Sequence, residues 1–412
     1  MQHSNWQQLF RGRDVVVISP QFWGDLWVSK HWIASELSRH TRVVFVEPAI
    51  WLGGLVREPR QLSRHLNRLV RPLRRIKDNL FVFSPKLLPG VLGSEPEQLV
   101  AQARRLVARM NLRDTVVLNF GTNYEFASSF NNAVSVYYCV DPFYPTPGRE
   151  NAERETCARS DMIFAISDAY KELLQKHGTG RPIHVIPHGF AFEQAREIDE
   201  DPHATMPPEL ARLPRPIWGF AGSIHDSYVD LDRLEHIARA RPHASIVMIG
   251  PHKNNPIGPD LSPQGLARIQ ALGNVHLLGP RHFLDLPRYV RHFDVGLVLI
   301  NTKDFDGSDK TSKRTLFKWL LYLSLGKPVV APLMSEATRI DELVYLARND
   351  AEYLECLDRA SAERGERRDA RIQYASQFSF DNVLNRIADP LRASLSVQTR
   401  PAATASSPLP AQ

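Results

Sequence analysis

The chain alternates β-strand patterns with helical patterns in two successive series, and this alternation limits the possible fold more than any other feature. The first series runs from the β-branched segment 14–19 to segment 184–189, and the second begins at residue 217. Polar residues with five prolines separate them at 199–216, which indicates a linker. Strands that alternate with helices predict parallel sheets covered by helices on both faces.

We therefore predict an α/β protein with two Rossmann-like, doubly wound parallel-sheet domains that face a cleft, since 412 residues exceed one ordinary core. The predicted bounds are 1–197 for the N-terminal domain, 198–216 for the linker and 217–371 for the C-terminal domain. A C-terminal helix at 372–395 is expected to pack back on the first domain. The Pro/Ala/Ser-rich tail 396–412 is expected to be disordered.

Composition argues against a membrane-spanning or secreted chain. No apolar run approaches the roughly 18 residues that cross a bilayer, and the first residues lack the apolar core of a signal peptide. The three cysteines, Cys139, Cys157 and Cys356, have neither metal-binding spacing nor an even count. We therefore expect a cytoplasmic protein with free thiols and no metal.

Segment 57–77 holds eight arginine and lysine residues against one glutamate, so the excess of positive charge that gives the chain its net +6 is local to it. Its apolar residues recur at helical spacing, so the segment is predicted to be a basic amphipathic element. Such an element suits an anionic membrane surface, although a solvated face or a mobile loop explains the pattern equally. Nucleic acid is disfavoured, because aromatic residues are not interleaved with the cations. The cations assigned to this membrane- or acceptor-side surface are Arg64, Arg68, Arg71, Arg74 and Arg75.

Residues 315–330 predict a helix that ends at Gly326 and leads into a buried strand. Lys318 lies near the N-terminus of this helix, where the helix dipole does not favour a cation. A bound polyanion such as a diphosphate would explain it, as would a lysine whose stem packs while its amine reaches water. Gly222 ends an earlier strand and would let a phosphate approach the backbone.

The ordered motifs HVIPHG, FAGSIHD, NVHLLGP, FDVGLVLI and FKWLLYLSLGKPVV resemble the sugar-nucleotide-binding half of GT-B glycosyltransferases. The segments FWGDLWVSKHWIASELSRHTRVVFVEP and VYYCVDPF resemble a narrower group. That group contains the bacterial surface-polysaccharide and exopolysaccharide transferases of the teichuronic-acid and xanthan glucuronosyltransferase type. The resemblance spans roughly residues 14 to 390.

The resemblance implies transfer of a sugar from a UDP- or GDP-linked donor to a glycan or lipid-linked acceptor. The reaction would be metal-independent, need no cofactor, and run in bacterial polysaccharide biosynthesis, on the cytoplasmic side and peripherally at the cell membrane. Two alternatives stay open: a non-hydrolysing sugar-nucleotide epimerase and a non-catalytic GT-B scaffold. The residues expected to bind the nucleotide sugar are Gly222, Ser223, Ile224, Gly250, Pro280, Arg281, Ile300, Thr315, Phe317, Lys318 and Leu321.

Two residues, Lys318 and Asp141, carry the implied chemistry. Lys318 matches the lysine that holds the diphosphate, where it would stabilise charge on the leaving group. Asp141 matches the base of the xanthan-type enzymes and follows a predicted parallel strand, where α/β sheets place ligand-contacting residues. A simple Asp-Pro turn at Asp141 remains the alternative, and for Gly250 a strand-ending turn does.

The sequence departs from the GT-B pattern at three positions. Retaining members often carry two glutamates where this chain has Lys313 and Leu321, so an inverting reaction is favoured. Pro280 cannot bond the base through its side chain, which leaves the nucleobase open. Asp304–Asp306 has a DxD pattern but lies in a late loop, and we interpret it as a polar loop.

Overall fold

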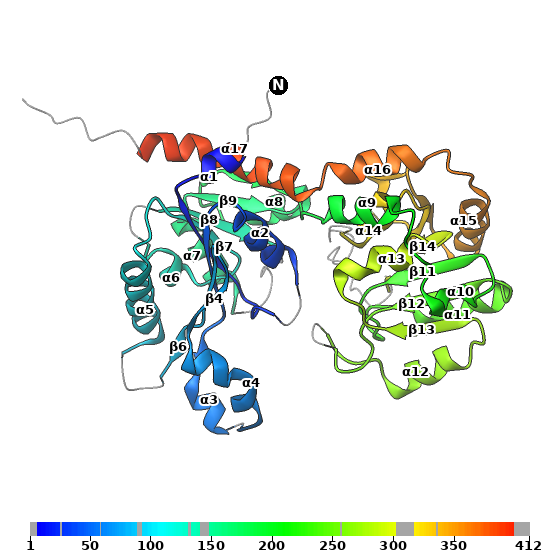
Figure 1. The fold of residues 1–412 in the computed structure, drawn as a ribbon, viewed down its shortest axis with the longest axis horizontal. Coiled ribbons are helices and arrows are strands. Elements are labelled where there is room, and N and C mark those ends of the chain that lie inside the picture. The colour runs from blue at the N-terminus through cyan, green and yellow to red at the C-terminus, as the bar shows by residue number, and fades with distance from the viewer. Residues whose placement is uncertain are drawn as a thin grey trace, which may run out of the picture. The chain divides into compact units, whose positions relative to one another are not determined.

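The structure is a computed structural model that describes residues 6–24, 27–57, 59–88, 93–130, 133–140, 148–255, 258–301, 317–334 and 337–398. Only the backbone is described at 55–57, 59–64, 317–318, 337–338 and 396–398. The chain divides into two compact units (Figure 1). Unit 1 comprises residues 1–23, 30–186 and 384–412, and unit 2 comprises residues 24–29 and 187–383.

Unit 1 contains an eight-stranded sheet in the order β10-β9-β8-β7-β1-β2-β5-β4. All neighbouring strands are parallel except β4 and β5. The strands are β1 (Asp14–Ile18), β2 (Arg42–Val46), β4 (Leu73–Lys77), β5 (Leu80–Phe83), β7 (Val116–Asn119), β8 (Val134–Cys139), β9 (Met162–Ala165) and β10 (Ile183–Val185). A separate two-stranded sheet pairs β3 (Ile50–Trp51) with β6 (Lys86–Leu87).

The helices of unit 1 are α1 (Trp6–Phe10), α2 (Ser29–Leu37), α3 (Leu52–Arg57), α4 (Pro59–Val70), α5 (Glu95–Met110), α6 (Tyr124–Ala127), α7 (Glu150–Arg159) and α8 (Asp168–Gln175). Helix α5 shows how local sequence sets its bounds. It begins at a capping box of Ser94 and Glu97 and ends at Asn111 in the left-handed conformation. Its residues Leu99 and Leu106 recur on one face and pack on the sheet, which fixes its orientation.

Unit 2 contains a six-stranded, fully parallel sheet in the order β13-β12-β11-β14-β15-β16. The strands are β11 (Ile217–Ala221), β12 (Ser245–Ile249), β13 (Val275–Gly279), β14 (Val295–Leu297), β15 (Val329–Pro332) and β16 (Tyr345–Ala347). The helices are α9 (Phe192–Glu200), α10 (Pro208–Ala211), α11 (Leu231–Ala240), α12 (Pro263–Gln270), η1 (Phe283–Asp285), α13 (Leu286–Val290), α14 (Phe317–Ser324), η2 (Ala337–Ile340), α15 (Asp350–Ala362) and α16 (Arg368–Ser376). Helix α17 (Phe380–Gln398) begins in unit 2, and its residues from Leu384 onward belong to unit 1.

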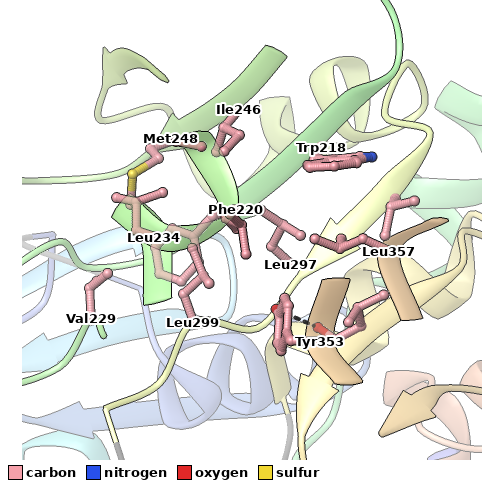
Figure 2. Close-up of a cluster of buried hydrophobic side chains, with 14 of the residues drawn as sticks. Trp218, Phe220, Val229, Leu234, Ile246, Met248, Leu297, Leu299, Tyr353 and Leu357 are labelled. Carbon is pink, nitrogen blue, oxygen red and sulfur yellow. Dashed lines mark hydrogen bonds between the residues drawn. The ribbon is translucent and has the colours of Figure 1, made fainter. Parts of the chain in front are cut away.

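The core of unit 2 lies on both faces of its sheet. Trp218 and Phe220 of β11 point into one cluster, which Leu234 of α11 and Tyr353 of α15 complete (Figure 2). The alternate β11 residues, such as Ile217, belong to the cluster on the other face. Alternate side chains of a strand point to opposite faces, and here both faces are covered. This double burial explains why the strand sequences are continuous apolar runs.

The structure confirms the α/β class with parallel sheets and corrects three predicted elements. The basic segment 57–77 is not one amphipathic helix, because α4 ends at Val70 and Pro72 precedes strand β4. Proline lacks the N–H that a continuing helix needs. The proline-rich segment 199–216 contains helix α10, with Leu210 buried. The predicted helix 372–395 is two helices, α16 and α17, with the break at 377–379.

The three cysteines are free and buried, as the sequence predicts. Among the described residues, no helix is both long enough and apolar enough to cross a membrane. The predicted disordered tail lies outside the described residues from 399 onward.

Candidate functional site

The order of strands in unit 2 marks one edge of its sheet as a ligand site. The chain passes from β11 to β12 and β13 in one direction, and then returns to place β14 on the other side of β11. In such sheets ligands bind outside the carboxyl ends of the strands, at the point where the direction reverses. Here that point lies between Gly222, which follows β11, and the residues 298–301 that follow β14.

The loops after β11 and β12 approach each other so closely that a side chain would not fit between them. A Cβ atom on Gly250 would lie 1.7 Å from the carbonyl oxygen of Gly222. The Gly222 N–H donates to Ile249 O at 2.8 Å, and the Gly250 N–H donates to Gly279 O at 3.0 Å. Gly250 is therefore required by packing and does more than end a strand. The Gly222 N–H is occupied by this contact.

Polar side chains hold the next part of the edge. Ser223 is buried, and its Oγ accepts a hydrogen bond from Asn255 Nδ2 at 2.6 Å. Asp226 accepts from the backbone N–H and the hydroxyl of Ser262, each at 2.8 Å. Partial burial would raise the pKa of Asp226, but these hydrogen bonds outweigh it and lower the pKa. The loop after β11 is therefore fixed to the 252–262 region.

Helix α14 is attached to the same edge by Tyr322. The buried hydroxyl of Tyr322 accepts a hydrogen bond from the Ala221 N–H at 2.8 Å, one residue before Gly222. The ring packs where a side chain on Gly296 would lie, since a Cβ there would be 2.6 Å from Tyr322 Cγ. This arrangement sets the position of α14 relative to the end of β11.

The structure places the predicted site residues at different depths. Ile224 is 0% exposed and Leu321 is 3% exposed, and both belong to the core, so neither is available to contact a nucleotide. Pro280 is exposed. Ile300 is half-buried and pairs with Val229 through an isolated β-bridge, beside the end of β14.

The side chain of Arg281 is already committed to contacts within unit 2. Its Nε donates to the Tyr289 hydroxyl at 2.8 Å, one terminal nitrogen donates to Leu278 O at 2.7 Å, and the other donates to Glu209 at 3.0 Å. The guanidinium carbon also lies 5.3 Å from the ring centre of Tyr289. These contacts give Arg281 a structural role, and its predicted binding role stays a prediction.

Several predicted residues lie partly or wholly outside the described residues. Asp141 and Thr315 do so entirely. Phe317 and Lys318 are the first two residues of α14, but only their backbone is described. The same holds for Arg64 in α4. Their predicted roles stay predictions.

Sequence reasoning assigned no role to Glu47, which organises the carboxyl edge of unit 1. Glu47 follows β2, and its side chain is 0% exposed. It forms ion pairs with Arg68 at 3.3 Å and Arg74 at 3.0 Å, and it accepts a hydrogen bond from the Trp23 N–H at 3.0 Å. The hydroxyl of Ser84 also donates to it. Its position at the end of a parallel strand, the argument used for Asp141, would have identified it.

The Glu47 cluster corrects the predicted basic surface. Arg68 and Arg74 are directed at a buried carboxylate, and their side chains are only 13% and 14% exposed. Arg71 and Arg75 remain exposed. Alternation in strand β4 explains part of this, because Arg74 and Arg75 point to opposite faces.

A second buried polar group in unit 1 lies at its own switch point, between β1 and β7. Asn119 is the last residue of β7 and is 0% exposed. Its Oδ1 accepts from the Gly121 N–H at 3.1 Å, whereas its Nδ2 has no hydrogen-bond partner among the described residues. The buried Lys30 ammonium lies 5.7 Å from the ring centre of the next residue, Phe120.

No group of three or more histidine, cysteine or acidic side chains that could hold a metal occurs in the described parts of the chain. No family model and no curated protein matches the sequence.

Solved structures match almost the whole chain at low identity. Sucrose-phosphate synthase from Thermosynechococcus elongatus is 12% identical with a TM-score of 0.65, covering 93% of this chain and 100% of that one. An α,α-trehalose-phosphate synthase (UDP-forming) from Burkholderia vietnamiensis is 15% identical with a TM-score of 0.58, covering 94% and 100%. HepE of Anabaena, in complex with UDP and glucose, is 14% identical with a TM-score of 0.58, covering 92% and 99%. These similarities show the GT-B fold, as the sequence predicts.

Proposed function

We propose that the chain is a glycosyltransferase that moves a sugar from a nucleotide-sugar donor to a glycan or lipid-linked acceptor. The observation that carries this proposal is the switch-point edge of unit 2. Its close Gly222–Gly250 contact shapes the end of β11, and the Tyr322 bond to Ala221 attaches helix α14 to the same strand end. Helix N-termini and strand ends of this kind bind phosphates. The match to HepE in complex with UDP and glucose supports a nucleoside diphosphate there.

In the proposed reaction, an acceptor hydroxyl oxygen attacks the anomeric carbon of the donor sugar. The new glycosidic bond forms as the bond from that carbon to the diphosphate oxygen breaks, and the leaving nucleoside diphosphate keeps the electron pair. Asp141 takes the hydroxyl proton as general base. Lys318 stabilises the charge that develops on the diphosphate, so that no metal is needed. Attack from the opposite side inverts the anomeric carbon.

The proposal also includes where in the cell the enzyme acts. A bacterial polysaccharide transferase acts at the cytoplasmic face of the membrane, and the exposed Arg71 and Arg75 of unit 1 would contact anionic lipid there. Raising the ionic strength would weaken this attachment.

Product detection with UDP-, GDP- and dTDP-sugars tests the function. Transfer to an acceptor supports it, and conversion of the donor sugar without transfer would show an epimerase instead. Binding of nucleoside diphosphate with no donor consumed would show a non-catalytic scaffold. Thermal denaturation with each nucleotide identifies the base, because a ligand that binds only the folded state raises the melting temperature.

Two variants separate binding from chemistry. Lys318→Ala should weaken nucleoside diphosphate binding about 10- to 150-fold, which corresponds to the ~1.5–3 kcal/mol of a hydrogen bond to a charged group. Asp141→Asn should abolish transfer and leave that affinity unchanged. Lys176→Ala, at an exposed lysine of unit 1, is the control. Full turnover in the Asp141 variant would exclude it as the base.

A further inference from the structure

Unit 1 has a hollow on the side of helix α5, at the edge of its sheet. Its volume is about 220 Å³, and it lies between α5 and strands β4, β5 and β6. The residues that line it are Pro72, Leu73, Phe83, Lys86, Gln102, Arg105, Leu106 and Arg109. The proposed transfer reaction uses none of these residues.

The charged groups around the hollow are all cationic. Arg105 and Arg109 are exposed and lie one turn apart on α5, and no carboxylate is among the lining residues. The ammonium of Lys86 donates to the carbonyl oxygen of Leu69, in the last turn of α4. Both ends of the Gln102 amide bond the backbone of Lys86. The hollow therefore attracts an anion, and its two arginines are the groups that can bind one.

The rest of the hollow is apolar and small. Leu106 is 3% exposed and Phe83 is 9% exposed, and both belong to the core that α5 closes. Complete small-molecule sites usually have ~300–1,000 Å³, so 220 Å³ holds only part of a larger molecule. The shape suits an apolar segment next to an anionic group, with the remainder of the molecule outside.

Exposed apolar side chains also occur on the elements that line the hollow or adjoin them. Of the six large hydrophobic side chains exposed in the described parts of the chain, five belong to elements around it: Trp51, Leu66, Val70, Ile76 and Leu88. They lie on β3, α4, β4 and just after β6, and Val70 and Pro72 are two residues apart. Exposed apolar residues mark an interaction site where they form one patch. Together with the exposed Arg71 and Arg75, they match the interface of an anionic bilayer.

We propose that the hollow binds one anionic membrane lipid. The phosphate lies between Arg105 and Arg109, and the first part of an acyl chain packs on Leu73, Phe83 and Leu106. The exposed apolar residues of α4 and β4 then enter the bilayer interface. This inference rests on the membrane placement in the proposed function and is independent of the transfer chemistry.

The test is calorimetric titration of the full chain with dihexanoylphosphatidic acid below its micelle concentration. We expect one site per chain, and no binding of dihexanoylphosphatidylcholine, which has no net charge. The double variant Arg105→Gln/Arg109→Gln should bind about 25-fold more weakly, as two cations at about 1 kcal/mol each imply. Arg104→Gln is the matched control, because Arg104 is an exposed neighbour on α5 that does not line the hollow.

Three results would overturn the proposal. They are failure of the lipid to bind, a loss of lipid binding in Arg104→Gln as large as the loss per arginine in the double variant, and binding of inorganic phosphate as tightly as the lipid. The last result would show a free-phosphate site without a lipid chain. Flotation with phosphatidylcholine vesicles, with and without phosphatidic acid, should show the same ranking of variants. Melting curves of each variant confirm the fold. Neither assay contains a nucleotide or an acceptor, so failure here leaves the transferase proposal untouched, and failure of transfer leaves the lipid site untouched.

Discussion

The two units have the same kind of parallel sheet, but the carboxyl edges of those sheets are held differently. In unit 2, the edge is held by the glycine backbone contact, by neutral hydrogen bonds that Ser223 and Tyr322 accept, and by the Asp226 carboxylate that accepts from Ser262. In unit 1, the edge is held by the buried carboxylate of Glu47 between two arginines. The first edge has no buried ion pair among these contacts of the described residues. The second has its charge neutralised within the protein.

The carboxyl edge of a parallel sheet can therefore be held in place in two ways. A backbone contact leaves room for an anion, and it depends on shape, so added volume should disrupt it. A buried ion-pair cluster depends on charge, so loss of one partner should disrupt it. The edge of unit 2 should therefore respond most to added volume, and the edge of unit 1 to loss of charge.

The largest effect is expected for Glu47→Gln. Removing the carboxylate charge leaves Arg68 and Arg74 facing each other in a mostly buried site, and loss of one partner from a buried pair costs about 3–5 kcal/mol. Urea denaturation measures the change. Glu36→Gln is the control, because its partner Arg39 is 59% exposed and such pairs contribute about 0.2–1 kcal/mol. A loss below about 1 kcal/mol at Glu47 would remove the contrast between the edges.

Gly250→Ala should disrupt the edge of unit 2. The added Cβ would lie 1.7 Å from Gly222 O, so the two loops must separate, at about 1–3 kcal/mol of folding free energy. Nucleoside diphosphate affinity should fall with it. Gly273→Ala is matched in chemistry but has nothing within 4 Å of its Cβ, and it should leave both quantities unchanged. Equal behaviour of the two variants would mean that the close contact is not needed.

Tyr322→Phe keeps the ring and removes only the hydroxyl that accepts from Ala221. A buried N–H that loses its partner costs about 1–3 kcal/mol. The comparable hydroxyl in unit 1, that of Tyr138, donates to Ile186 O at 3.1 Å. Tyr138→Phe should reduce stability similarly, but only Tyr322→Phe should also weaken nucleotide binding. Titration calorimetry decides, and an equal affinity in both variants would contradict the role of Tyr322.

The smallest effect concerns pH. Burial is the main cause that lowers the pKa of His276 and His292 in unit 2 and of His184 in unit 1. Below about pH 6.5, the unfolded chain binds protons that the folded chain does not. The free energy of unfolding therefore decreases as the pH is lowered, until the pH reaches the lowered pKa of these histidines in the folded chain. Urea midpoints at a series of pH values measure the slope. His292→Gln should flatten it, whereas His203→Gln, at an exposed histidine, should not.

The sequence was most informative where strands are buried on both faces. Segments 42–46, 217–221 and 245–249 form strands in the two predicted series, because continuous β-branched or aromatic runs leave few alternatives. It was least informative where a contact joins distant segments. Nothing in the order of residues pairs Tyr322 with Ala221, or Glu47 with Arg74. Leu321 was assigned by its position in a motif, and its burial depends on packing that no motif records.

The division of the chain has a consequence for synthesis on the ribosome. Unit 2 ends at Val383, inside α17, and the rest of that helix belongs to unit 1. Leu384 and Leu391 are fully buried, and the Trp6 N–H of α1 donates to Asn385 of α17 at 3.0 Å. Helix α1 can therefore make this contact only after α17 has been synthesised (Figure 1). The unit whose synthesis begins first is therefore the last to be completed. A ribosome stalled just after Val383 would carry every residue of unit 2. Its unit 1 would still lack the part of α17 that begins at Leu384.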